Sequence, residues 1–428
     1  MKLQTRDNTK KPIADRHALD DLLPFNGKKL SILDAERQPG LLVFPRDLGI
    51  NGDDIGNQEI FHIENDILVT GNVVGFIGIG DTDLTISSRF CTGDEDDYFL
   101  HYMLQKVMGV NVMNLQSHTN DERIYDFLLY LFPRMLINAL TQGLYKEYKT
   151  MKHNDSNVKG VIDISRHVKH NIPFFGNIAY NTREHSYDND MTELIRHTIE
   201  LIRHSYAELI LHANKQIEDA VLQIVSATPS YSPSRLRNVI INNTKPIRHP
   251  YYSLYMSLQR LCLMILRHEK MRYGNNRNQI HGILFDAAWL WEEYLNTLFS
   301  DCGFKHPQNK LQKGGIQLFS DNNYVPRYPD FLKSDFILDA KYKHIDGNPE
   351  RDDFHQIITY MYVLEAMKGG FVYPSDATRS THLGYLNGYG GELRKYAMKV
   401  PLLCQSLEEF KAFMRQEEKA IMHIIGHN

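Results

Sequence analysis

The sequence predicts a multidomain α+β protein, because three stretches of the chain follow different hydrophobic patterns. Its 428 residues are enough for two or three domains of roughly 100–200 residues each. Short apolar runs between turn residues come first, long runs with helical periodicity follow, and the last part mixes the two. We therefore expect a β-rich N-terminal region at residues 1–110, a mainly helical middle region at 111–275 and an α/β domain at 276–428.

The β-rich prediction for residues 1–110 depends on short apolar or alternating runs bounded by Gly, Asn and Asp. Examples are GLLVFP, EIFHIENDILVTG and NVVGFIGIGDTDLTISSRF. The glycines of GFIGIGD, at 75–81, lack the spacing of a nucleotide-binding loop, and no helical pattern follows them. We therefore predict a β-hairpin at this point.

The middle region is dominated by long apolar stretches of helical character. We expect helices within 121–151, at 191–214 and at 251–274, with Pro133 as a kink or break in the first. A strand or turn leading into a short helix is expected at 158–171. This part of the chain therefore predicts a helical domain.

The last part of the chain alternates helices and strands. A helix is expected at 284–303, a strand around 336–342, a helix at 352–367, a strand at 369–374 and a final helix at 407–425. This order, over roughly 150 residues, is typical of an independent α/β domain.

Composition bounds the class of protein. The N-terminus has no apolar signal-peptide core, and no apolar run approaches the roughly 18 residues that a membrane span needs. The four cysteines lie far apart and form no short-spaced zinc motif. The net charge of -4 does not exclude nucleic acid, because a local basic patch is enough to bind phosphates. We expect a cytoplasmic protein with no membrane contact.

The stretch YPDFLKSDFILDAKYKH, at 328–344, is the strongest chemical signal. Asp339 and Lys341 are two residues apart, so both side chains leave the same face of a half-buried strand. If Asp330 lies across a turn, its carboxylate can reach the same point. Mg²⁺ takes one or two carboxylates together with waters and substrate phosphate, and it makes water a usable nucleophile near neutral pH. The alternative interpretation is an ordinary solvated strand face.

Polar residues on the flanking helices support the metal-site interpretation. Gln356 and Tyr360 are four residues apart, and hence lie on one face of the helix that follows the strand. Glu292, in the preceding helix, offers a third acid, although a surface helix acid is an equal alternative for it. Its neighbour Glu293 is the less favoured choice.

Basic residues surround the proposed site in the sequence. Such local positive charge suits a phosphate backbone, although it is also found on ordinary charged surfaces. These residues are Arg327, Lys333, Lys341 and Lys343, which Lys310 and Lys313 could join.

Four of these stretches resemble, in order and spacing, the McrC family, the nuclease subunit of McrBC modified-cytosine restriction systems. They are LFDAAWLWEEYL, PDFLKSDFILDAKYK, DDFHQIITYMYVL and GGFVYP. VKGVIDISRHV resembles the middle region of that family, and NVVGFIGIGDTDLTISSRF its N-terminal β segment. Family members usually have Pro-Lys where this chain has Ser88-Arg89.

The resemblance implies a C-terminal nuclease domain of the PD-(D/E)xK type. It implies that Asp330 and Asp339 are the Mg²⁺ ligands and that Lys341 is the catalytic lysine. It also implies that Glu292 and Gln356 are supporting active-site groups. Tyr360 is expected to be structural.

The resemblance also implies a partner, a McrB-like AAA+ GTPase ring that reads modified cytosine in double-stranded DNA. The chain itself has no GxxxxGK[ST] loop, so we expect it to bind no nucleotide. The N-terminal region is expected to dock on the ring. Two alternatives remain: a self-sufficient restriction endonuclease, and a non-catalytic activator of a GTPase.

Overall fold

The chain folds into two compact units, which we call unit 1 and unit 2. Unit 1 combines Met1–Ser117 with Asn276–Asn428, and unit 2 is His118–Asn275. The computed structural model describes residues 1–29, 40–45, 59–80, 82–91, 97–108, 120–206, 210–247, 249–271, 280–307, 314–321, 326–345, 347–388 and 390–426. The expected three-part division stays a prediction, but its first and last parts share one compact unit.

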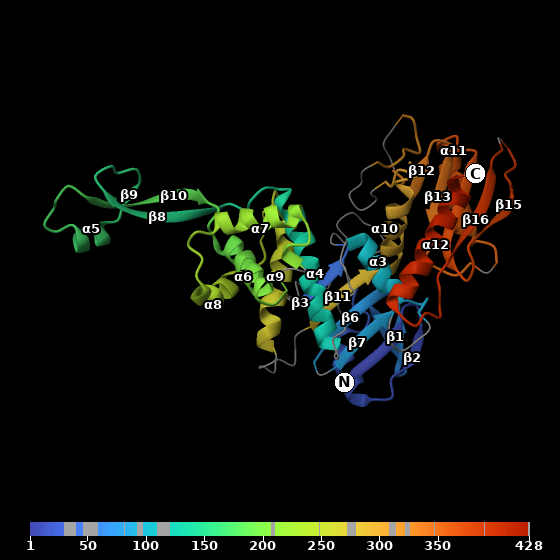
Figure 1. Cartoon of the computed structure of the whole chain (residues 1–428), viewed down its shortest axis with the longest axis horizontal. Coiled ribbons are helices and arrows are strands. Elements are labelled where there is room, and N and C mark those ends of the chain that lie inside the picture. The colour runs from blue at the N-terminus through green and yellow to red at the C-terminus, as the bar shows by residue number, and fades with distance from the viewer. Residues whose placement is uncertain are drawn as a thin grey trace. The chain divides into compact units, whose positions relative to one another are not determined.

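The first sheet of unit 1 joins segments from both ends of the chain (Figure 1). Its strands, in spatial order, are β1 (Lys2–Arg6), β7 (Thr82–Ser87), β6 (Val73–Ile79), β11 (Ile280–Asp286) and β3 (Gly40–Phe44). β6 and β7 are antiparallel neighbours, so the predicted hairpin at 75–81 is confirmed. The helix predicted at 284–303 starts later, because its first residues end β11.

Two glycines allow β11 to approach β6. A Cβ on Gly75 would lie 2.1 Å from the carbonyl oxygen of Ile283, and one on Gly282 would lie 2.1 Å from that of Phe76. Both glycines also have φ angles that side chains disfavour, 136° and 151°. The pairing of distant strands therefore depends on glycine at these positions.

A small second sheet and two short helical segments complete the N-terminal part. The sheet has the order β2 (Lys10–Pro12), β5 (Ile67–Thr70) and β4 (Phe61–Glu64), and the helical segments are α1 (Arg16–Leu22) and η1 (Leu23–Phe25). Apolar side chains of both sheets and α1, such as Leu22, Leu68 and Ile86, form one core.

Three helices of unit 1 meet at a buried acid. They are α3 (Tyr98–Met108), α10 (Ala287–Phe299) and α12 (Leu407–Gly426). Glu418 of α12 accepts hydrogen bonds from Tyr102 at 2.8 Å, Tyr294 at 2.9 Å and Lys106 at 3.0 Å. The acid therefore ties the last helix to the other two.

The C-terminal sheet of unit 1 contains the strand predicted around 336–342. Its order is β12 (Phe331–Lys333), β13 (Phe336–Ala340), β14 (Lys368–Ser375), β16 (Glu392–Lys399) and β15 (Arg379–Tyr385). β13 is antiparallel to β12 and parallel to β14. All five of its residues are buried, so the expectation of a half-buried strand is wrong.

Burial of β13 follows from its interior position in the sheet, between β12 and β14, and from the helices that cover it. Helix α11 (Arg351–Val363) contributes Ile357 and Met361 to a core that includes Ile337 and Phe371. Helix α10 also contacts β13. A strand covered in this way is a costly place for a charged side chain.

Unit 2 contains the expected helical body. Its helices are α4 (Asn120–Leu140), α6 (Asp190–Tyr206), α7 (Lys215–Ala227), η5 (Pro233–Arg235), α8 (Leu236–Asn242) and α9 (Ser253–Met271). Pro133 lies inside α4. The helix predicted at 191–214 ends earlier, since Asn214 caps the start of α7.

Unit 2 also contains an extended arm, residues 147–186, that the helical prediction missed. Strands β8 (Glu147–Asp155) and β10 (Ile178–Ser186) pair along nine positions, and β9 (Val161–Ile162) and α5 (Ile164–His170) lie at the far end (Figure 1). Arg166 fixes this end by donating to the carbonyl oxygens of His153 and Tyr180. The predicted strand or turn and short helix at 158–171 are confirmed.

The far end of the arm exposes apolar side chains, which we call the arm tip. Val161, Ile164 and Phe175 are 78%, 72% and 85% exposed. The other members of the arm tip are Ile162, Val168, Ile172 and Phe174. Searched over the residues that the structure describes, no helix is long and apolar enough to cross a membrane.

Candidate active site

The hairpin of β12 and β13 brings the two predicted acids together. Asp330 lies directly before β12, and Phe331 pairs with Leu338 across the hairpin. The turn uses Ser334 at a φ of 48°. The backbone N–H of Ala340 donates to Asp330 Oδ2 at 2.6 Å, so the carboxylate of Asp330 lies beside the strand end that carries Asp339 and Lys341.

Lys341 lies at the centre of the site. Its Nζ is 2.8 Å from Asp339 Oδ2 and 3.1 Å from Asp353 Oδ1. It also donates a hydrogen bond to Gln356 Oε1 at 3.3 Å. Four polar side chains from one strand and one helix therefore converge on a single position at the end of the sheet.

Burial sets the electrostatics of the carboxylates. Asp339 is 1% exposed, and burial together with the neighbouring Asp330 raises its pKa to about 7. Burial also raises the pKa of Asp330, although Lys341 and the Ala340 N–H favour its ionised form. Burial alone would lower the pKa of Lys341, but the surrounding carboxylates raise it above its usual value. The negative charge of the carboxylates at this site is therefore only partly compensated by Lys341.

Asp353 is a site residue that the sequence analysis missed. Its Oδ2 accepts a hydrogen bond from Lys343 Nζ at 2.9 Å, while its Oδ1 contacts Lys341. It also accepts from the backbone N–H of Glu350 at 3.2 Å as part of the capping box of α11. Despite burial, the two lysines lower its pKa. Its position three residues before Gln356, on the same helix face, is a signal that could have identified it.

The structure brings Gln356 into the site and supports it with Tyr360. Gln356 Nε2 donates to the hydroxyl of Tyr360 at 3.0 Å. This bond directs the amide oxygen of Gln356 towards Lys341. The predicted shared face of the two residues is thus observed.

Glu293 on α10 is linked to the site through His306. His306 Nδ1 lies 2.6 Å from the backbone oxygen of Asp330, and its Nε2 is 3.9 Å from Glu293 Oε1. Since a carbonyl can only accept, Nδ1 is the donor. Glu292 lies half-buried on the same helix, and its supporting role stays a prediction.

Basic residues near the site have different surroundings. Lys343 pairs with Asp353, and Lys333 Nζ donates to the carbonyl of Cys302 at 2.7 Å. Arg327 is exposed next to the hairpin. Lys310 and Lys313 lie outside the described residues.

The residues present fit a divalent cation. Asp330 and Asp339 offer carboxylate oxygens, the ligand type that Mg²⁺ takes, and a cation would compensate their crowded charge. Within the described ranges, no group of three or more His, Cys, Asp or Glu side chains forms a fuller ligand shell. Two carboxylates suit Mg²⁺, which usually keeps several waters.

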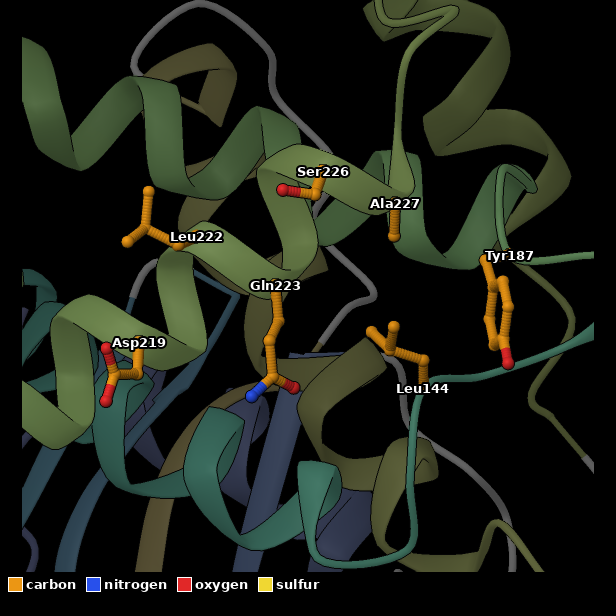
Figure 2. A pocket seen from close by; sticks show the side chains of 7 residues that line it. All are labelled: Leu144, Tyr187, Asp219, Leu222, Gln223, Ser226 and Ala227. Atoms are coloured by element: carbon orange, nitrogen blue, oxygen red, sulfur yellow. The ribbon is translucent and has the colours of Figure 1, made fainter.

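A cavity of about 580 Å³ lies elsewhere, in unit 2 (Figure 2). Helix α7 supplies most of its wall, and Leu144 and Tyr187 face that helix. It contains none of the predicted site residues.

These features define the class: a mixed α/β protein of several sheets, with a carboxylate pair and a lysine suited to a divalent cation. The chain belongs to the family of McrBC 5-methylcytosine restriction system components, whose model matches residues 68–374. No curated protein matches the sequence significantly.

Two solved structures from Thermococcus gammatolerans are similar to this chain. One is a refined half-complex from the tetradecameric assembly of McrB AAA+ hexamers with bound McrC, at 14% identity and a TM-score of 0.50. The match covers 97% of this chain and 100% of that chain. The other is the McrBC complex, at 15% identity and a TM-score of 0.35, covering 72% of this chain and 90% of that chain. The first likeness shows a similar fold along almost the whole chain, and the second adds nothing to it.

Proposed function

We propose that this chain is the DNA-cleaving component of a McrBC restriction system and hydrolyses phosphodiester bonds with a divalent metal. The observation that carries the proposal is the convergence of Asp330, Asp339 and Lys341 at the end of β13. We assign the C-terminal sheet, with α10 and α11, to the PD-(D/E)xK nuclease type. The substrate proposed from the family is double-stranded DNA that contains modified cytosine.

In this proposal, the carboxylates of Asp330 and Asp339 hold a Mg²⁺ ion. When bound, such an ion supplies Lewis acidity towards a phosphate oxygen and acidifies water. The Nζ of Lys341 is placed to orient the attacking water and to offset the charge that develops on the phosphate. Gln356 keeps that ammonium group in place from the helix side.

The burial of Asp339 argues against a purely regulatory protein. Ionising a carboxylate in a covered strand beside a second carboxylate opposes folding, as its raised pKa indicates. An activator of a GTPase would have no use for this arrangement. A nuclease needs it, because a bound cation makes use of both charges.

We further propose that a McrB-like AAA+ GTPase is the partner and that the arm tip of unit 2 contacts it. In the similar structure, McrC is bound to McrB hexamers. The exposed side chains of Val161, Ile164 and Phe175 lie close in sequence on an arm fixed by Arg166, and apolar surface of this kind is typical of protein interfaces. The expected docking of residues 1–110 stays a prediction, and the arm tip is the better-supported surface.

The decisive experiment measures cleavage of 5-methylcytosine DNA by the purified chain with its GTPase partner, GTP and Mg²⁺. We expect cleavage that stops when EDTA is added and is absent in Asp339→Ala, while stimulation of the GTPase is retained. Cleavage by Asp339→Ala at the wild-type rate would show that the site assignment is wrong.

The same assay separates the two alternatives. Cutting by the chain alone, with Mg²⁺ and no nucleotide, would identify a self-sufficient endonuclease. GTPase stimulation by a chain that never cuts DNA would identify an activator.

A further inference from the structure

The residue after the candidate catalytic lysine is held by the N-terminal part of unit 1. Tyr342 is buried, and its hydroxyl donates to Ser88 Oγ at 3.0 Å. Ser88 follows directly after β7 in the first sheet, 254 positions away in the sequence. The two segments therefore meet through a specific polar contact as well as through apolar packing.

Ser88 is itself fixed on several sides. It is fully buried, its backbone N–H donates to the carboxylate of Asp97, and its Oγ accepts from the backbone N–H of Phe90 at 3.1 Å. Asp97 also accepts from the Leu100 N–H at 3.0 Å, at the start of α3. The hydroxyl that receives Tyr342 thus belongs to a rigid turn.

Arg89 and Phe90 hold the ring of Tyr342. The Arg89 guanidinium lies 5.0 Å from the ring centroid, and the Phe90 ring contacts it edge-on at 5.1 Å. Arg89 is fixed in turn by Asp7, which is fully buried and accepts from Arg89 Nε at 2.7 Å. We call Asp7, Ser88, Arg89 and Phe90 the N-terminal clamp.

Fixing Tyr342 also fixes Lys341. Successive residues of an extended chain point to opposite faces, and the Lys341 N–H continues the strand ladder by donating to the Val372 oxygen at 2.9 Å. With the Tyr342 ring held from one face, the backbone of Lys341 cannot turn without breaking the clamp contacts. The side chain of Lys341 therefore points to the face of the strand opposite to Tyr342, which is the face that carries Asp339.

We propose that the N-terminal clamp positions Lys341 through Tyr342, so that Ser88 and Arg89 are positioning residues for the hydrolysis. This inference rests on the proposed nuclease function. It predicts that weakening the clamp affects turnover more than substrate binding, because a small displacement of a catalytic group is costly to rate.

The test compares Tyr342→Phe with Tyr102→Phe in the full chain with its partner. Each substitution removes one buried hydroxyl of unit 1 that donates a hydrogen bond. The hydroxyl of Tyr102 donates to Glu418, and that of Tyr342 donates to Ser88. Their thermal stabilities should fall alike. We expect only Tyr342→Phe to lower kcat, by roughly 10-fold, with the KM for DNA unchanged. Ser88→Ala should act like Tyr342→Phe, and Ser88→Thr, which keeps the hydroxyl, should restore most of kcat.

A second measurement does not depend on cleavage. Amide hydrogen exchange of residues 336–343 should accelerate in Tyr342→Phe and remain as in the wild type in Tyr102→Phe. If the wild type fails to cut DNA but this exchange difference is found, the proposed function fails and the clamp stands. If both variants keep wild-type exchange at 336–343 and equal kcat, the clamp is overturned.

Discussion

Strand β13 in unit 1 and the arm in unit 2 each depart from the usual distribution of side chains, in which charged groups are exposed and apolar groups are buried. β13 is covered on both faces, yet it contains Asp339, and Lys341 follows at its end. The arm is solvated along most of β8, yet its tip exposes Ile164 and Phe175. Charge lies inside in one region, and apolar surface lies outside in the other.

Both reversals oppose folding or solubility, so each points to a ligand that the isolated chain lacks. A carboxylate pair with one buried member, Asp339, is suited to a cation, and an exposed apolar tip is suited to another protein. In the proposed function, this difference separates chemistry from assembly, with the first assigned to unit 1 and the second to unit 2. If this division is correct, changes in one region should leave the function of the other intact.

The largest effect is expected for Asp339→Asn. Removing one of two neighbouring carboxylates should lower DNA cleavage by roughly 1000-fold, since a bound metal is worth several kcal/mol to the transition state. The melting temperature of the metal-free protein should rise or stay unchanged, because a buried charge is removed. Cleavage kinetics and calorimetry on the same sample check both statements. Asp335→Asn, an exposed acid in the same hairpin, is the matched control and should alter neither.

The next effect concerns the arm tip. Ile164→Ser combined with Phe175→Ser should weaken binding to the GTPase by about 100-fold, because exposed anchors of this size are each worth about 1.4 kcal/mol at an interface, a factor of about ten each. Leu403→Ser in unit 1 removes a side chain that is 91% exposed and should leave the affinity unchanged. A titration with labelled partner measures both. If the arm-tip variant and Leu403→Ser bind the GTPase with equal affinity, the arm tip is not the binding surface.

A moderate effect is expected for Asp353→Asn. Losing the carboxylate that spans Lys341 and Lys343 should lower kcat by roughly 10–30-fold, through misplacement of Lys341. Binding to the GTPase should not change. Glu350→Gln is the control, because Glu350 also contacts Lys343 but its side chain is 76% exposed. If Glu350→Gln lowers kcat to a similar extent, the loss in Asp353→Asn is due to Lys343 and not to misplacement of Lys341.

The smallest effect tests whether every buried ionisable group marks a ligand site. His197 on α6 is 5% exposed, its ring lies 4.8 Å from that of Tyr231, and burial lowers its pKa from 6.5 to about 4. The unfolded chain then binds more protons than the folded one between these values, so stability is lost as the pH falls from about 6.5 to about 4. We expect a loss of roughly 1–2 kcal/mol for unit 2 over this range.

Thermal unfolding against pH measures this loss in the wild type and in two variants. His197→Gln should flatten the dependence, and His204→Gln, an exposed histidine on the same helix, should leave it as it is. DNA cleavage at neutral pH should be unaffected by either substitution. An unchanged pH dependence in His197→Gln would contradict the assignment.

The geometry of the candidate site was largely predictable from local sequence. A spacing of two residues from Asp339 to Lys341 in a strand, and of four from Gln356 to Tyr360 in a helix, fixes which side chains share a face. The short hairpin then brings Asp330 alongside. Asp353 was missed although its spacing to Gln356 was a usable signal. His306 was missed, and Glu293 was the less favoured choice, because their positions depend on how a loop and a helix pack on the sheet, which no local spacing determines.

The fold was predictable where periodicity is strong and unpredictable where pairing is distant. The hairpin of β6 and β7 and the helices α9 and α12 follow from pattern alone. The pairing of β11 with β6 does not, because it joins residues separated by the whole of unit 2. The arm was missed because β8 is polar and largely exposed, and the two buried residues of β10 are adjacent, so neither strand shows the alternating burial that identifies a strand.

The position of β11 between β6 and β3 also has a consequence for synthesis of the chain. β6 and β3 leave the ribosome early, but the strand that joins them follows only after roughly 200 further residues, a delay of about 10–40 s at ordinary translation rates. During that interval β6 presents an open edge, with Ile77 and Ile79 on a strand that is later buried. The nascent N-terminal half is therefore the stage at which this protein most needs protection from aggregation.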